Sequence, residues 1–258
     1  MAQKEAKRTA ILNWLSLTDF TSQQAQLNSS RHSKTGDWLL RSTEFEQWLG
    51  TTKQILFCTG MPGAGKTVMT SMVIEDLQRK FQGRSDIGIA YIYCNFEQNS
   101  EQGTDRLLAS LLKQLVQRTP AMPRCVEDLY NDSKEHKQNG PPAQELVSPI
   151  VTAISLFKKT FIILDALDEC QSSPNSMLLK ALFEIHHQTA ANIFVTSRRV
   201  SHIERAFINC VSIDIRARPE DLTAYINARL EELQEFVQDR PDLQNSVRDT
   251  IISAADGV

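Results

Sequence analysis

The sequence lacks the features that would mark a nucleic-acid-binding, membrane or secreted protein. It carries little net charge, because 28 Lys and Arg residues stand against 31 Asp and Glu residues, which leaves a formal charge of −3. This balance provides no general attraction to nucleic acid or to an anionic membrane, so we expect neither as a partner. No apolar run approaches the roughly 18 residues of a membrane span. The apolar stretch near the start, Ala10 to Leu15, is too short for a secretory signal.

Cysteine pairs with redox or metal-binding spacing are also missing. The five cysteines are Cys58, Cys94, Cys125, Cys170 and Cys210, which lie 31 to 45 residues apart without a Cys-x-x-Cys pair. Their odd number and wide spacing predict reduced thiols in a cytoplasmic protein, where they serve as small buried hydrophobic residues. The adjacent His186 and His187 have no partner at zinc-ligand spacing.

The 258 residues allow one large domain or two small ones, and their composition is that of an ordinary globular protein. Short apolar segments alternate with segments of helical periodicity, which favours an α/β fold with a parallel sheet covered on both faces. The predicted strands span 54–59, 88–94, 161–165, 192–196 and 211–215. The predicted helices span 66–81, 104–118, 143–159, 176–189 and 219–237.

Two finer features of this pattern are also predictive. The last predicted strand, Val211 to Ile215, alternates apolar and polar residues, which is typical of an edge strand. Before the first strand, Thr43 and Glu46 match a capping box and Gly50 a C-terminal stop, which predicts a short helix. Its apolar residues would face the sheet: Phe45, Trp48 and Leu49.

One segment fits the phosphate-binding pattern Gly-x-x-x-x-Gly-Lys-Ser/Thr in full: Gly60, Met61, Pro62, Gly63, Ala64, Gly65, Lys66 and Thr67. It lies between a predicted strand and a predicted helix, where backbone N–H groups and the helix N-terminus can wrap a phosphate chain. Gly63 and Gly65 allow the backbone to approach the phosphate oxygens. We expect Lys66 to bind the β- and γ-phosphates and the Thr67 hydroxyl to bind Mg²⁺.

A second motif supports the first. The predicted strand Phe161 to Asp165 ends in a carboxylate and resembles a Walker B site. Because ligands collect at the carboxyl ends of parallel strands, Asp165 and Thr67 can meet around one Mg²⁺. A carboxylate just beyond this strand can hold the water that attacks the γ-phosphate, and we expect Glu169 in this role before Asp168.

A third motif follows the strand over 192–196. A strand next to the loop strand would direct Arg198 at the γ-phosphate, where a guanidinium can detect whether that phosphate is present. We prefer Arg198 over Arg199 because the hydroxyls of Thr196 and Ser197 precede it at the strand end.

Together, the segments GMPGAGKT, FIILDALDEC and NIFVTSRR resemble the NACHT type of STAND ATPases. The resemblance is to the group found in fungal heterokaryon-incompatibility and ankyrin-repeat proteins, related to the nephrocystin 3-like N-terminal domain, and it covers about residues 11–258. It implies a P-loop NTPase three-layer sandwich with a five-stranded parallel sheet of the additional-strand type. In that order, the strand ending in Thr196 to Arg199 lies between the loop strand and the Asp165 strand.

The resemblance also implies where the domain boundaries lie and which segment lies near the adenine of the nucleotide. Residues 1–50 would form a helical flank, 51–216 the NACHT core and 217–258 the start of a helical lid that is apparently truncated. The segment Thr35 to Trp38 would lie near the adenine of ATP or ADP. The sequence departs from the family pattern at Arg199, where the family usually has proline.

Three functions remain open at this point. The first is an ATP/ADP-binding signalling switch with slow Mg-dependent hydrolysis, which self-associates or serves effector or repeat domains of a longer protein. The second is a P-loop small-molecule kinase with the loop 131–142 as a lid, although residues 126–160 contain no arginine to cover the phosphates. The third is a nucleotide-holding scaffold without hydrolysis.

Overall fold

The structure is a computed structural model, and it describes most of the chain. The described residues are 2–30, 36–95, 103–135, 140–170, 177–216, 218, 220–223, 226 and 240–255. Most of the helix predicted over 219–237 lies outside these residues, although 220–223 and 226 are helical. Within the described part of the chain, no helix has the length and apolar character needed to cross a bilayer.

A five-stranded parallel sheet forms the centre of the molecule. Its strands are β1 (Ile55–Thr59), β2 (Ile87–Tyr93), β3 (Lys159–Asp165), β4 (Asn192–Ser197) and β5 (Val211–Asp214). They lie in the order β2-β3-β4-β1-β5, and every pair is parallel. The predicted α/β fold is confirmed, with β5 at an edge and β4 inserted between β1 and β3.

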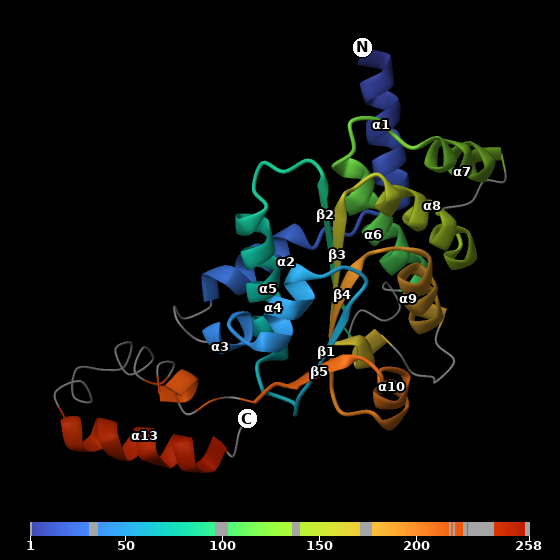
Figure 1. Ribbon diagram of the computed structural model, residues 1–258. Helices are drawn as coiled ribbons and strands as arrows, with labels where there is room; N and C mark the ends of the chain where they lie inside the picture. The colour runs from blue at the N-terminus through green and yellow to red at the C-terminus, as the bar shows by residue number, and fades with distance from the viewer. Residues whose placement is uncertain are drawn as a thin grey trace.

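The helices form a layer on each side of this sheet (Figure 1). On one face lie α4 (Thr43–Gly50) and α5 (Lys66–Lys80), and on the other lie α6 (Thr104–Gln117), α8 (Ala143–Ser155) and α9 (Met177–Gln188). The remaining α-helices with printed bounds are α1 (Ala2–Leu15), α2 (Thr21–Ser30), α3 (Asp37–Leu40), α7 (Arg124–Glu135), α10 (Ser201–Ala206) and α13 (Pro241–Ala255). The arrangement is the three-layer sandwich that the family resemblance implies.

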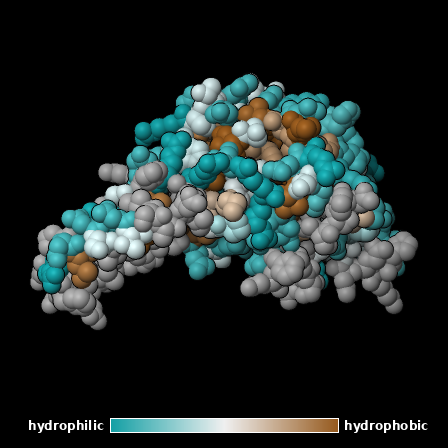
Figure 2. Space-filling view, turned by 90° about the horizontal axis from the view of Figure 1, so that it is seen from below, coloured by the Kyte–Doolittle hydropathy of each residue, from teal (hydrophilic) through white to brown (hydrophobic). Residues whose placement is uncertain are grey.

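The strand order brings three strand ends together. Thr59 at the end of β1 pairs with Ser197 at the end of β4, and Leu164 of β3 pairs with Val195 of β4. The turn after β1 lies at the lower edge of the sheet in Figure 1. Figure 2 shows the molecule from this lower side, where brown apolar residues lie within a surround of teal polar ones and α13 projects to one side.

The short helix α4 is fastened to the sheet by buried groups. The Trp48 indole is 1% exposed, and its Nε1 donates to the backbone oxygen of Ile193 at 2.9 Å. The Asn192 side chain in turn donates to the backbone oxygen of Trp48 at 2.5 Å. Burying a side chain of this size contributes roughly 2–3 kcal/mol, so Trp48 helps to fix where the chain enters β1.

Two local predictions were wrong. The N-cap of α4 is Ser42 and not Thr43, because Ser42 has an extended backbone and its Oγ accepts from the Phe45 N–H at 3.2 Å. The helix predicted over 143–159 ends at Ser155 as α8. The chain leaves it to begin β3, where the Lys158 N–H donates to the backbone oxygen of Asp86 at 2.8 Å.

Candidate functional site

The phosphate-binding segment forms a tight turn between β1 and α5. Gly63 and Gly65 have φ values of 81° and 87°, in the left-handed region that favours glycine. Gly65 is the N-cap residue of α5, so this helix starts at Lys66 with its N-terminal N–H groups at the turn. The local geometry is that of an anion-binding loop followed by a helix N-terminus.

Lys66 folds back over this turn. Its Nζ donates to the backbone oxygens of Gly60 and Met61, both at 2.9 Å. Partial burial lowers the pKa of Lys66, while the carboxylates of Asp168 and Asp165 act in the opposite direction. The ammonium therefore lies between the loop and the acids at the end of β3, where it can exchange loop carbonyls for phosphate oxygens.

The carboxylate of Asp165 is the centre of a buried cluster of three threonine hydroxyls. Thr67 donates to its Oδ2, and Thr70 and Thr196 both donate to its Oδ1, each at 2.7 Å. Asp165 is 2% exposed, and this burial raises its pKa although the three hydrogen bonds oppose the rise. The predicted meeting of Thr67 and Asp165 is present, across 98 residues of sequence.

Sequence reasoning did not assign Thr70 to this cluster. It lies three residues after Thr67 on α5, so helical periodicity places both hydroxyls on the same face. Thr196 comes from β4, and its Oγ1 also accepts from the Ala166 N–H at 2.9 Å. The same threonine thus holds both the Asp165 carboxylate and the start of the following turn.

Asp168 and Arg198 form an ion pair beside this cluster. The Arg198 Nε donates to Asp168 Oδ2, and the Arg198 backbone N–H donates to Oδ1 at 2.8 Å. The Asp168 side chain is 4% exposed and that of Arg198 is 47% exposed. Burial acts to raise the pKa of Asp168, but the contacts with Arg198 outweigh it and lower that pKa. Both carboxylate oxygens are engaged, so Asp168 is placed to orient Arg198 and is poorly placed to accept a proton.

A cavity of about 320 Å³ joins these elements. It is lined by Pro62, Gly63, Gly65, Lys66, Thr67, Val68, Ala166, Asp168, Glu169 and Arg198. Glu169 belongs to the 3-10 helix η2 (Leu167–Cys170) that follows β3. The Thr67 hydroxyl and the Asp165 carboxylate supply adjacent oxygens of the kind that Mg²⁺ prefers, so these residues fit that ion.

Arg199 takes a different direction from Arg198. Its Nη2 lies 2.8 Å from Asp214 Oδ1 at the end of β5, and it is not among the residues that line the cavity. The two consecutive arginines are thus held by different carboxylates, Arg198 by Asp168 of η2 and Arg199 by Asp214 of β5. Arg198 lines the cavity and Arg199 does not, and the role of Arg198 at the γ-phosphate stays a prediction.

The segment expected near the adenine lies partly outside the described residues, which begin again at Gly36. The Gly36 N–H donates to Asp221 Oδ1 at 2.9 Å, and the Arg218 guanidinium lies 4.2 Å from the centre of the Trp38 indole. This segment therefore contacts the beginning of the predicted lid. Its position near the adenine stays a prediction.

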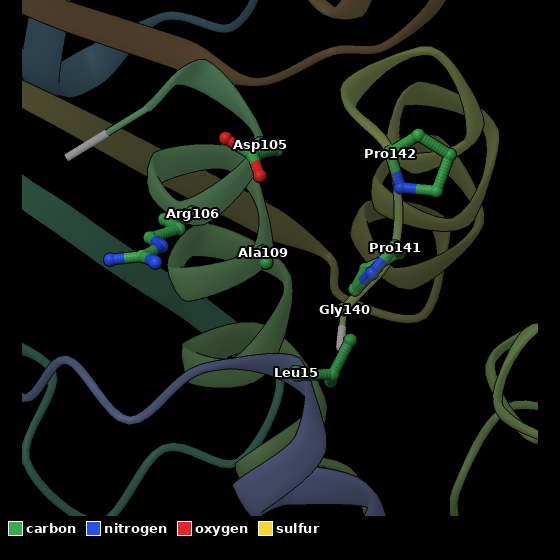
Figure 3. A pocket seen from close by; sticks show the side chains of 7 residues that line it. All are labelled: Leu15, Asp105, Arg106, Ala109, Gly140, Pro141 and Pro142. Atoms are coloured by element: carbon green, nitrogen blue, oxygen red, sulfur yellow. The ribbon is translucent and has the colours of Figure 1, made fainter. Parts of the chain in front are cut away.

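A second cavity, of about 420 Å³, lies elsewhere (Figure 3). Asp105, Arg106 and Ala109 of α6 border it on one side, and Pro141 and Pro142 ahead of α8 border it on the other. None of the predicted site residues lines it. The predicted site residues gather instead around the turn after β1.

Residues 34–198 match the family described as Nephrocystin 3, N-terminal. The whole chain is 23% identical, over 276 aligned residues, to the vegetative incompatibility protein HET-E-1 of Podospora anserina, and it spans 20% of the length of that protein.

Solved structures are similar in fold. The Orc1 protein of Aeropyrum pernix, solved in complex with DNA, has a TM-score of 0.53 and 16% identity, over 85% of this chain and 53% of that one. A Walker-type ATPase of Pyrococcus abyssi also has a TM-score of 0.53, with 12% identity over 90% of this chain and 68% of that one. At 16% and 12% identity, these similarities show that the fold is shared, which is the P-loop ATPase fold.

These similarities correct the prediction that nucleic acid is not a partner. That exclusion was wrong, because the fold is shared with a protein whose structure was solved in complex with DNA. The argument failed physically because net charge averages over the whole surface, whereas contacts with nucleic acid depend on local groups. A formal charge of −3 therefore does not exclude contacts with nucleic acid.

Proposed function

This chain belongs to the Nephrocystin 3, N-terminal family, and we propose that it is an ATP/ADP-binding switch with slow Mg-dependent ATP hydrolysis. The observation that carries the proposal is that one cavity is lined by Lys66, Thr67, Glu169 and Arg198, and that the Thr67 hydroxyl donates to Asp165. These are the groups that phosphoryl transfer from a nucleotide requires.

The loop and its lysine would bind the phosphates. The N–H groups at the start of α5 and the Lys66 ammonium supply positive potential on one side of the cavity. Thr67 and Asp165 would hold Mg²⁺, which neutralises phosphate charge when it is bound. A cation there would also relieve the cost of keeping Asp165 ionised in a buried position.

Glu169 and Arg198 would act on the terminal phosphate. Glu169 lines the cavity and would hold the attacking water. Arg198 is half-exposed, so it can exchange Asp168 for an oxygen of the γ-phosphate without crossing the protein interior. This exchange of partners would distinguish ATP from ADP, and it provides the differential contact that a population shift needs.

The partners of such a switch would lie in other segments of a longer protein or in further copies of this chain. The chain spans about a fifth of the relative from Podospora anserina. A nucleotide module of this length is therefore compatible with effector or repeat domains outside it.

The first experiment measures nucleotide binding with and without Mg²⁺ by calorimetry. Lys66→Ala is expected to abolish binding of ATP and ADP, because it removes the cation at the phosphate loop. Lys80→Ala, at the far end of the same helix, is the matched control and is expected to bind normally. Equal binding by Lys66→Ala and the unaltered protein would contradict the assigned site.

The second experiment measures ATP turnover. Glu169→Gln should keep ATP binding and lose hydrolysis, since an amide cannot accept the proton of the attacking water. Glu184→Gln on α9 serves as the control, because it changes a surface carboxylate that bonds to Gln188 in the same helix. Normal turnover in Glu169→Gln would remove Glu169 from this role, and ATP binding without turnover in the unaltered protein would favour the non-hydrolysing scaffold.

A further inference from the structure

The end of β4 is bound to the turn that follows β3 through the side chain of Thr196, which is 0% exposed. The Thr196 hydroxyl donates to Asp165 Oδ1 at 2.7 Å, and the same hydroxyl oxygen accepts from the Ala166 N–H at 2.9 Å. A hydroxyl has a single proton to donate, so its donor function is used by Asp165. Thr196 therefore joins the expected metal ligand Asp165 to the first backbone N–H after β3.

A second hydrogen bond continues this connection to Glu169. The Glu169 N–H donates to the backbone oxygen of Ala166 at 2.8 Å. Two hydrogen bonds thus lead from the Thr196 hydroxyl, through Ala166, to the backbone of Glu169. Because Glu169 lines the cavity at the phosphate loop, a shift of this turn would move its carboxylate within the site.

The backbone conformation of Ala166 makes the bond from Thr196 important. Ala166 has a φ of 50°, in the left-handed region that is unfavourable for a residue with a Cβ. It is also buried, so its N–H would lack an acceptor if the Thr196 hydroxyl were removed. A buried N–H without an acceptor would destabilise the turn further. The Thr196 hydroxyl therefore stabilises a conformation that alanine by itself does not favour.

Thr70 differs from Thr196 in this one respect. Its hydroxyl donates to the same oxygen, Asp165 Oδ1, at the same distance of 2.7 Å, and it is also 0% exposed. Its other hydrogen bond, at 3.0 Å, goes to the backbone oxygen of Lys66 in its own helix. The two threonines thus share the contact with Asp165, and Thr196 alone of the two accepts from Ala166.

The strand β4 also holds this turn at a second point. The backbone N–H and the Nε of Arg198 both donate to Asp168, which precedes Glu169. In the proposed function, the Arg198 guanidinium leaves Asp168 for the γ-phosphate. The bond between Thr196 and Ala166 takes no part in that exchange, so it would keep the turn in place after the guanidinium has left.

We propose that Thr196 is a positioning residue for hydrolysis, which places the Glu169 carboxylate through the backbone of Ala166. This inference rests on the proposed function, in which Glu169 holds the attacking water. Among the described residues, those that line the cavity do not include Thr196, so its loss should lower kcat more than ATP affinity. A displacement of about 1 Å at a reacting group can lower the rate about 100-fold.

The test compares Thr196→Val with Thr70→Val by steady-state ATP hydrolysis and by calorimetric ATP binding. Both changes keep the branched shape and remove one donor to Asp165 Oδ1, so effects that pass through Asp165 should be similar. We expect kcat to fall about 10- to 100-fold in Thr196→Val and no more than about threefold in Thr70→Val. The ATP affinities of the two variants should agree within about threefold. Thr196→Ser restores the hydroxyl and should bring kcat to within about threefold of the unaltered protein.

A second measurement needs no nucleotide. Amide hydrogen exchange in the ligand-free protein reports on the N–H groups of residues 166–169. Exchange there should be faster in Thr196→Val than in Thr70→Val or the unaltered protein. If Thr196→Val does not fold, Thr196→Ser and Thr196→Cys replace it, because their side chains have a similar shape and the thiol is the weaker hydrogen-bonding group. The serine variant should then show the higher kcat and the slower exchange.

The outcomes separate this inference from the proposed function. Equal losses of kcat in Thr196→Val and Thr70→Val would overturn the inference, because the effect would then pass through Asp165. Full turnover in Thr196→Val would overturn it as well. If the unaltered protein binds ATP without hydrolysing it, the hydrolytic part of the proposed function fails, and hydrogen exchange still decides whether Thr196 holds the turn. Unchanged exchange of residues 166–169 in Thr196→Val would overturn that holding role whatever the protein does with ATP.

Discussion

Asp165 is the last residue of β3, and Asp168 follows it by three residues. Both carboxylates are almost fully buried, yet their pKa values are shifted in opposite directions. Asp165 is surrounded by neutral hydroxyls, and burial raises its pKa. Asp168 is bound to a guanidinium, and its pKa is lowered in spite of burial. Burial alone therefore does not set the charge of a carboxylate in this protein, because the chemical type of its partner decides the outcome.

The difference predicts opposite effects of pH on stability. A raised folded pKa at Asp165 means that the free energy of unfolding falls as pH rises above about 3.9, the usual unfolded value. A lowered folded pKa at Asp168 means a stabilising contribution that is present above about 3.9 and is lost as pH falls through the lower folded value. The ionised Asp165 thus lowers the free energy of unfolding, and a bound cation can remove this loss. Asp168 raises the free energy of unfolding without any ligand.

The largest effect is expected from Asp165→Asn, which keeps the size of the side chain and removes its charge. We expect Mg-dependent ATP affinity to fall about 10- to 100-fold, the usual effect of altering groups around a metal. Without ligand, the variant should be more stable than the unaltered protein at pH 7, because an amide avoids the cost of a buried charge. Calorimetry measures the first and denaturant unfolding the second, and an unchanged dependence on Mg²⁺ would separate Asp165 from the cation.

A smaller effect of opposite sign is expected from Asp168→Asn. The loss should be about 1–2 kcal/mol at pH 7, between the values for exposed and for buried pairs, because Asp168 is buried whereas Arg198 is half-exposed and screened by solvent. Arg198→Ala and the double variant complete a double-mutant cycle measured by denaturant unfolding. Additive losses in this cycle would show that the two side chains do not stabilise the fold as a pair.

The third prediction separates two hydroxyls of the Asp165 cluster. Thr70→Val removes a donor to Asp165 Oδ1 and should cost about 1 kcal/mol in unfolding free energy. It should leave the Mg-dependence of ATP binding nearly intact, whereas Thr67→Val should weaken it, because only Thr67 lines the cavity. Parallel ATP titrations with and without Mg²⁺ measure this contrast, and equal losses in the two variants would contradict it.

The smallest effect is expected from Arg199→Ala. The ion pair of Arg199 with Asp214 is solvent-exposed and lies outside the cavity, so we expect no measurable change in Tm or in ATP turnover. The measurement is a thermal melt and an ATP turnover assay of Arg199→Ala, with Arg198→Ala measured in parallel. A loss of turnover as large as that of Arg198→Ala would show that both arginines serve the site.

Local motifs predicted the main parts of this protein. The phosphate loop was recognised from its glycines and Lys66, and the end of β3 from the apolar run before Asp165. Both are set by residues that are neighbours in the sequence. The five strands were found by their apolar character, and the edge position of β5 by its alternation. The order of the strands came from a resemblance, since periodicity within each strand carries no information about its neighbours.

Sequence reasoning predicted the contact of Thr67 with Asp165 but missed other contacts that join distant segments. Asp168 was a candidate for holding water, and the structure places it against Arg198, 30 residues away. Thr196 reaches Asp165 only because β4 lies between β1 and β3.

The amino-acid sequence by itself determined the phosphate loop, the helix that begins at Lys66, the acid at the end of β3 and the α/β alternation, because each depends on residues within one turn or one strand. Only the tertiary structure decided which groups share the Asp165 carboxylate and which acid holds Arg198. Those choices depend on strand order and register, and pairing across a sheet brings together side chains that no local spacing relates.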